Sequence, residues 1–267
     1  SSGGVAVPEK FAEFPLTEYV WEDGFRPRRW QPGSYVDRYT VADSWRHSRG
    51  RTNRLDLHLD RFEETAGPLP EGFVEEMVAM ASEGELFPRI ALYKGELILQ
   101  LRFAPLPRDT TSLTYADAPD PRKHPIVKGP DFIPLRLHRR EYMDAQTDDI
   151  AITDSSGAMV EASNGALVAW DGETLVTPEG VYLPSITLRQ VTERARWLGV
   201  PVRREALTVE SCCDRPLWYL NSLHGISPVS EIRTAQGTII PPAHAATEQW
   251  REGWWSGFTP ATAVLHR

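Results

Sequence analysis

Hydrophobic and polar positions in the first part of the chain switch between strand-like and helical spacing. Residues 38–47 ("RYTVADSWRH") alternate as a half-buried strand does. Helical spacing follows in 54–67 and again in 69–84, and each of these runs ends at a glycine. The run "RIALYKGELILQLRF" then predicts two strands joined by the turn "YKGE".

The second part of the chain begins with a predicted helix in 134–147 and continues as a series of short strands. The strands are "DIAIT", "AMVEA", "GALVAW" and "TLVTP", with turn residues between them. A helix follows in "LPSITLRQVTERARWLG", and "VPVRREALTVE" and "PLWYLNS" add further strands. Because the connections are short, we expect an α/β or α+β fold with a sheet rich in antiparallel pairs.

A polar, proline-rich stretch, "YADAPDPRKHP", separates the two parts and has the composition of an exposed linker. The pattern therefore predicts an N-terminal α/β domain in 1–116, a linker in 117–125 and a C-terminal domain in 126–267. The aromatic stretch "WREGWWSGF" near the end fits a core segment, a dimer face or a pocket wall.

Composition narrows the class of protein. A formal net charge of −8 over 267 residues argues against a nucleic-acid-binding protein. The only cysteines, Cys212 and Cys213, are adjacent and offer no disulfide framework. The N-terminal "SSGGVAVPEK" does not resemble a signal peptide, and no apolar run is long enough to span a membrane. These features predict a cytoplasmic protein.

Common catalytic motifs are missing from the sequence. It contains no phosphate-binding P-loop, no dinucleotide-binding glycine motif, no G-x-S-x-G elbow and no H-E-x-x-H or C-x-x-C pair. The seven histidines are scattered, so we expect no metal site.

Three local features could carry chemistry, and each also has an ordinary structural explanation. Lys128, one of four lysines, follows Ile126-Val127; desolvation would favour the neutral amine that a Schiff base needs, or the side chain is an ordinary surface lysine. Ser185-Ile186-Thr187 precede a helix and could bind an anion or simply cap it. Glu161 points inward if its neighbours face solvent, or it belongs to a polar strand face.

Together these features match the needs of one cofactor. Pyridoxal 5′-phosphate (PLP) requires a lysine for its aldehyde, a carboxylate for its ring nitrogen and a helix end for its phosphate. At these residues the sequence resembles the class IV aminotransferase family of fold-type IV PLP enzymes. The resemblance rests on Lys128, which lies twenty residues before "DDIAITDSSG", and on the stretches "GAMVEAS", "LPSITLR", "NSLHGISPV" and "HLDRF".

The resemblance implies a role for each matching residue. Lys128 would form the covalent link, Glu161 would contact the ring nitrogen, and Leu183 would pack on the ring. The phosphate would be held by Arg61, Ile186, Thr187 and Ser222, with Ser185 in place of the usual glycine and Asn221 beside the cup. Arg46, Arg102 and His224 are the candidate residues for binding the substrate.

The family resemblance also implies a two-domain fold, with a smaller N-terminal α/β domain and a larger C-terminal domain built on a barrel-like sheet. It implies a homodimer and an anionic amino-carboxylate substrate, while the net charge and the lack of a long apolar run predict no nucleic-acid or membrane partner. "N-S-L" resembles the aminodeoxychorismate lyase branch, and Ile133 replaces a tyrosine found in many transaminases. We therefore favour the lyase, with a transaminase of branched-chain or D-amino acids and a non-catalytic metabolite-binding protein as alternatives.

Overall fold

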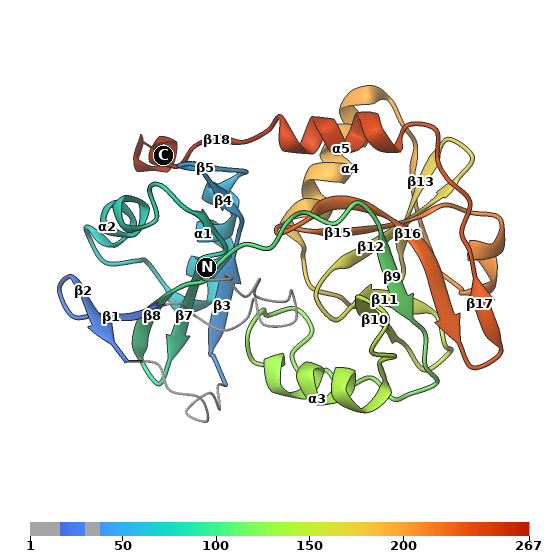
Figure 1. Cartoon of the computed structure of the whole chain (residues 1–267), viewed down its shortest axis with the longest axis horizontal. Coiled ribbons are helices and arrows are strands. Elements are labelled where there is room, and N and C mark those ends of the chain that lie inside the picture. Colours follow the sequence, from blue (N-terminus) through green and yellow to red (C-terminus); the bar gives the residue numbers. More distant parts are fainter. Residues whose placement is uncertain (1–16, 30–37, 267) are drawn as a thin grey trace, which may run out of the picture. The chain divides into compact units, whose positions relative to one another are not determined.

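The computed structural model describes residues 17–29 and 38–266, and the chain divides into two compact units (Figure 1). The first unit comprises Ser1–Pro107 and Gly257–Arg267, and the second comprises Arg108–Ser256. The N-terminal segment, which the sequence predicts not to be a signal peptide, lies outside the described residues.

The described part of the first unit contains a five-stranded antiparallel sheet with the order β2-β1-β8-β7-β3. Its strands are β1 (Thr17–Trp21), β2 (Phe25–Arg28), β3 (Val41–Ser44), β7 (Arg89–Tyr93) and β8 (Glu96–Leu101). Helix α1 (Leu55–Ala66) packs against β3, and helix α2 (Phe73–Met80) contacts the C-terminal segment.

A second, small sheet in the first unit has the order β18-β5-β4-β6 within the described ranges. It consists of β4 (His47–Ser48), β5 (Arg51–Thr52), β6 (Glu85–Leu86) and β18 (Thr259–Pro260), and the short helix η3 (Ala261–His266) follows β18. The C-terminal residues therefore complete the first unit, although the sequence places them in the C-terminal domain.

Local patterning predicts part of the first unit correctly, and it leaves out β1, β2 and most of the small sheet. The helix expected in 54–67 is α1, which Gly67 ends, and the two strands around "YKGE" are β7 and β8. Helix α2 is shorter than the predicted 69–84. It begins only after Gly72, whose φ of 85° is left-handed and interrupts the helical path.

Over the described residues, the second unit contains a mixed nine-stranded sheet with the order β11-β10-β9-β16-β15-β12-β13-β14, and β17 pairs with β16. Antiparallel pairs outnumber parallel ones, as expected. The strands are β9 (Thr111–Thr114), β10 (Asp149–Thr153), β11 (Met159–Ala162), β12 (Ala166–Asp171), β13 (Thr174–Pro178), β14 (Val202–Glu205), β15 (Leu217–Asn221), β16 (Gly225–Thr234) and β17 (Gly237–Ile239).

Helices α3 (Phe132–Tyr142), α4 (Ile186–Leu198) and α5 (Thr247–Trp255), with the short η2 (Glu210–Cys213), pack around this sheet (Figure 1). Helix α4 ends at Gly199, as the sequence predicts. Helix α5 packs against β16 and buries Trp250 and Trp254, so the tryptophan-rich stretch contributes to the core. In the described part of the chain, no helix combines the length and apolarity needed to cross a membrane.

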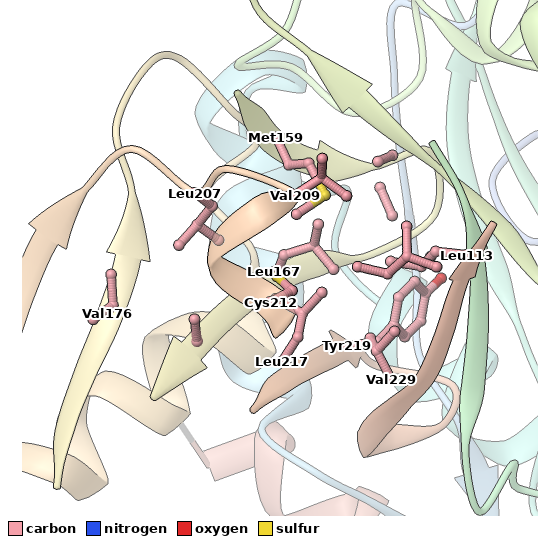
Figure 2. Packing of buried hydrophobic residues seen from close by; sticks show 14 residues of the cluster. Leu113, Met159, Leu167, Val176, Leu207, Val209, Cys212, Leu217, Tyr219 and Val229 are labelled. Atoms are coloured by element: carbon pink, nitrogen blue, oxygen red, sulfur yellow. The ribbon is translucent and has the colours of Figure 1, made fainter. Parts of the chain in front are cut away.

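Apolar side chains from the second unit's sheet and from the segment around η2 form one buried cluster (Figure 2). Tyr219 lies at its edge, and the buried thiol of Cys212 is one of two free cysteines in the described chain. The cluster consists of Leu113, Ala151, Met159, Ala162, Leu167, Ala169, Val176, Leu207, Val209, Cys212, Leu217, Tyr219, Val229 and Ile232.

The expected linker in 117–125 lies inside the second unit. Only 6% of the Arg122 side chain is exposed, because this arginine is held by several hydrogen bonds to the rest of the unit. The chain instead crosses between the units at Pro107–Arg108 and again at Ser256–Gly257.

Candidate functional site

Lys128 lies partly buried in a turn that leads into α3. Two backbone bonds shape this turn: Val127 N donates to His124 O at 3.1 Å, and Phe132 N donates to Gly129 O at 3.1 Å. Gly129 has a φ of 122°, a conformation that favours glycine. The expected shielding by apolar neighbours is incomplete, because Ile126 is 62% exposed.

Glu161 lies on β11, with 12% of its side chain exposed. From the sequence, Glu161 points inward if its neighbours face solvent, and this condition is not met, because Val160 and Ala162 are both buried. The strand is covered on both faces, so the alternation of polar and apolar residues does not report exposure here. The mostly buried position of Glu161 is instead evident from its ion pair with Arg122.

Arg122 is the cationic partner of Glu161, with Nη1 donating to Oε2 at 2.5 Å. The same guanidinium forms two bonds to the Asp120 carboxylate, at 3.0 and 2.9 Å, and one to Val181 O at 2.8 Å. Sequence reasoning missed Arg122, since it is 39 residues from Glu161 in a stretch that has linker composition.

Burial raises the pKa of Glu161 to about 7. Arg122 and the backbone amide of Leu183, which also donates to Glu161, act in the opposite direction, while the Asp120 charge adds to the rise. Burial is the largest of these effects, so Arg122 does not overcome it. Glu161 can therefore take up or release a proton near neutral pH.

The loop that carries Leu183 leads directly into the N-terminus of α4. Ser185 caps this helix, with its Oγ accepting from Leu188 N at 3.1 Å, so the capping explanation of this residue is confirmed. Buried Thr187 follows in the first turn, and its Oγ1 lies 3.5 Å from Ser222 Oγ. Two hydroxyls thus meet at a helix start, where backbone amides lack intrahelical acceptors.

Asn221 and His224 hold the turn that carries Ser222. The Asn221 Oδ1 accepts from the amides of Leu223 and His224, at 3.1 and 2.7 Å, and its Nδ2 donates to Asn164 O at 3.1 Å. His224 is 1% exposed, and its Nδ1 accepts from Arg108 N at 3.0 Å. These contacts give both residues a structural task in the β15–β16 connection.

Arg61 lies in the first unit, where it forms a bidentate ion pair with buried Asp43 at 2.8 and 2.9 Å. His58 Nδ1 lies 2.6 Å from the same carboxylate. Burial alone would raise the pKa of Asp43, but Arg61 and His58 outweigh it and hold that pKa well below its usual range.

Arg46 and Arg102 are also buried in the first unit. Arg46 donates to Pro105 O at 2.6 Å, and Arg102 donates to Phe87 O and Ser44 Oγ at 2.9 and 2.8 Å. The Arg102 guanidinium also lies over the Phe87 ring, 4.2 Å from its centre. Both side chains are thus held by neighbours in their own unit.

Comparison with known families decides the class of this protein. The sequence profile described as amino-transferase class IV matches residues 40–232, most of the chain. The chain belongs to the class IV aminotransferase family. It has the fold of fold-type IV PLP enzymes and is an aminotransferase or a lyase of that class. A search of curated proteins gave no significant match.

Solved structures with this fold include both reaction types. The branched-chain aminotransferase of Thermoproteus uzoniensis with norvaline has a TM-score of 0.73 at 16% identity, covering 92% of this chain and 99% of its own. The 4-amino-4-deoxychorismate lyase of Pseudomonas aeruginosa has a TM-score of 0.70 at 20% identity, covering 90% and 98%. An aminotransferase from Brucella abortus bound to PLP has a TM-score of 0.70 at 17% identity, covering 90% of this chain and 98% of its own.

The described residues were also compared with the requirements of a metal site. Across the described residues, no cluster of three or more His, Cys, Asp or Glu side chains is arranged to hold a metal ion.

Proposed function

We propose that the second unit of this chain binds PLP through Lys128, Glu161 and the start of α4, and acts on a small anionic amino-carboxylate. The observation that carries the proposal is the loop between Leu183 and Thr187. Its first residue donates to Glu161, and its last residue meets Ser222 at the helix N-terminus. One short loop therefore joins a carboxylate to an anion-binding helix end, the two polar features that the cofactor needs.

The residues fit the cofactor. Glu161 Oε2 is occupied by Arg122, and a titratable, mostly buried carboxylate is suited to accept a hydrogen bond from a protonated ring nitrogen. When bound, PLP supplies an electron sink for the carbon next to the substrate's amine. Glu161 would keep the ring nitrogen protonated, while the hydroxyls of Thr187 and Ser222 would donate hydrogen bonds to the phosphate.

Lys128 has two tasks in this proposal. Its Nζ would hold the cofactor through the aldehyde at rest, and the freed amine would move a proton at the reacting carbon of the substrate. Arg61 as a phosphate ligand, and Arg46, Arg102 and His224 as substrate residues, stay predictions from the resemblance. The homodimer and the cytoplasmic location are also predictions; sedimentation of the purified protein tests the first.

Of the two reactions in the family, we favour the lyase. In this reaction 4-amino-4-deoxychorismate loses pyruvate and becomes aromatic 4-aminobenzoate, without a second substrate. The support is the "N-S-L" stretch and Ile133, which stands where many transaminases have a tyrosine. The contacts of Asn221 weaken the first argument, since they assign its amide to the β15–β16 turn.

The first experiment tests cofactor binding. Purified protein incubated with PLP should gain a visible absorbance band, and borohydride reduction should attach the cofactor to Lys128, as located by mass spectrometry. Lys128→Ala should lose both. If wild type shows neither the band nor an adduct, the non-catalytic alternative replaces the enzyme.

The second experiment separates the reactions. The loaded protein should release equal amounts of pyruvate and 4-aminobenzoate from 4-amino-4-deoxychorismate over many turnovers. A transaminase should instead release one keto acid per bound cofactor from a branched-chain or D-amino acid when no acceptor is present. That second result without pyruvate release would contradict the lyase.

A further inference from the structure

The side chain of Asp131 makes unusual contacts for its position. Asp131 is the residue immediately before α3, where an aspartate commonly accepts hydrogen bonds from the first amides of its own helix. Here the side chain makes no such capping bond. Pro134, the third residue of the helix, has no amide hydrogen to be capped.

The Asp131 carboxylate instead turns back along the chain. It accepts from Lys123 N at 3.1 and 3.2 Å and from His124 N at 2.8 Å, and the residue is 5% exposed. Hydrogen bonds from amides to a buried carboxylate are charge-assisted and stronger than those between neutral groups. They close the loop from Lys123 to Asp131, and this loop contains Lys128.

Both ends of this loop are fixed to the rest of the unit. Arg122, the residue before Lys123, is bound to Glu161 on β11 and to Val181 O. At the other end, Asp131 leads into α3, where Arg139 donates to Ser163 Oγ at 3.0 Å. The path from the Glu161 carboxylate to the Lys128 turn therefore runs through Arg122 and the Asp131 bonds.

We propose that Asp131 is a positioning residue for Lys128: by tying Lys123 and His124 to the start of α3, its carboxylate sets where the lysine amine lies relative to Glu161. This inference rests on the proposed function. Without the carboxylate, two amides lose their acceptor and the turn around Gly129 gains freedom. A misplacement of about 1 Å can slow a reaction about 100-fold, so the link between Lys128 and the cofactor should form more slowly.

The test measures the cofactor-free protein with two probes. PLP with borohydride trapping reports the rate at which Lys128 is modified, and exposed Lys94 in the first unit, which has no bond to Asp131 among the described contacts, is an internal control. Pyridoxine 5′-phosphate, which lacks the aldehyde, reports binding to the ring and phosphate contacts without any covalent link. Urea unfolding shows whether each variant is folded.

In Asp131→Ala, trapping at Lys128 should slow by about 10- to 100-fold, while Lys94 trapping and pyridoxine phosphate affinity stay at wild-type values. Asp131→Asn keeps one acceptor oxygen, so its trapping rate at Lys128 should fall between those of wild type and Asp131→Ala. If the alanine variant does not fold, Asp131→Asn alone is compared with wild type. Asp148→Ala is the matched control, because that carboxylate also ties two segments, through Ser112 N and Oγ, and it should trap at the wild-type rate.

Two results would overturn the inference. Wild-type trapping rates in both Asp131 variants would show that the carboxylate does not position Lys128. A parallel loss of pyridoxine phosphate affinity in Asp131→Asn would show that Asp131 maintains the whole site. Failure of the proposed function looks different, since wild type itself would then bind neither probe.

Discussion

The ion pair between Glu161 and Arg122 changes the interpretation of this buried carboxylate. The sequence argument held that a buried carboxylate needs a cation and offered the cofactor ring as that cation. The structure supplies a protein cation, Arg122, and then divides it between Glu161 and Asp120. The carboxylate thus remains fixed in place and titratable, which suits a group that must adjust to a bound ring nitrogen.

Glu161 should make the stability of the cofactor-free protein depend on pH. Its pKa is about 7 when folded against a usual value of 4.5, so between these pH values the folded chain binds more protons than the unfolded chain. The free energy of unfolding should therefore fall as the pH rises from about 4.5 to 7, by roughly 3 kcal/mol in total.

Urea unfolding of Glu161→Gln across this pH range checks the prediction. The variant should lose the fall assigned to Glu161, since its side chain does not titrate. An identical pH profile in wild type and variant would contradict the raised pKa.

Asp43 makes the opposite prediction in the first unit. It is fully buried between Arg61 and His58, so Asp43→Asn leaves the mostly buried Arg61 guanidinium without its anion and should cost about 3 kcal/mol. Because the pKa of Asp43 is lowered on folding, this stabilisation is present above about pH 4 and is lost as the pH falls.

Native-state hydrogen exchange of the α1 amides at neutral pH measures this cost. Asp56→Asn is the matched control, because Asp56 pairs with Arg54 at the exposed start of α1, and it should cost less than about 1 kcal/mol. Equal effects of the two substitutions would show that the buried cluster adds no particular stability.

Helix α5 gives the sharpest prediction at the scale of elements. A Cβ on Gly225, at the start of β16, would lie 2.4 Å from the Trp254 ring of α5. Gly225 also has a φ of 70°, which other residues adopt at a cost of about 1 kcal/mol. Overpacking adds to this strain, so Gly225→Ala should destabilise the second unit by about 2 kcal/mol more than strain alone.

Gly199→Ala separates the two contributions. Gly199 has a similar φ of 73°, but nothing lies within 4 Å of its added Cβ. The difference between the two variants in urea unfolding therefore reports the clash with Trp254. If both variants lose the same free energy of unfolding, α5 moves away from the added methyl group at no energetic cost.

Elements whose information is local were predictable from the sequence. Helices α1 and α4 combine helical spacing with a terminal glycine, and the hairpin of β7 and β8 contains its own turn. Strand β9 was missed, since it consists of four residues stabilised by parallel pairing with β16, more than a hundred residues away. Helix α5 was missed because the positions of its tryptophans reflect their packing against β16 and not a helical repeat in the sequence.

The candidate site divides along the same line. Lys128, Glu161 and Thr187 could be proposed from the sequence because their neighbours match a family pattern. Arg122 and Asp131 were not, because their significance lies in bonds to residues brought near by folding or by a turn. Local pattern therefore points to the proposed chemical groups more readily than to the residues that contact them.

At the scale of the whole molecule, the C-terminus returns to the first unit after the chain has completed the second. Strand β18 pairs with β5, Ala261 N donates to Gly50 O at 2.8 Å, and Arg51 donates to Phe258 O at 3.0 Å. The short helix η3 contacts both α1 and α2 and buries Ala261 and Val264. Residues 257–266 thus pack onto the first unit, and Ala261 and Val264 join its core.

Deletion of 257–267 should therefore destabilise the first unit selectively. The deletion exposes apolar surface on α1 and α2 and leaves β5 without the partner strand at its edge. Hydrogen exchange should accelerate in α1, α2 and β5 and stay at full-length rates in β10 to β13, whose partners all lie in the second unit. Faster exchange throughout the chain would mean that the two units unfold together, and that the C-terminal segment stabilises both.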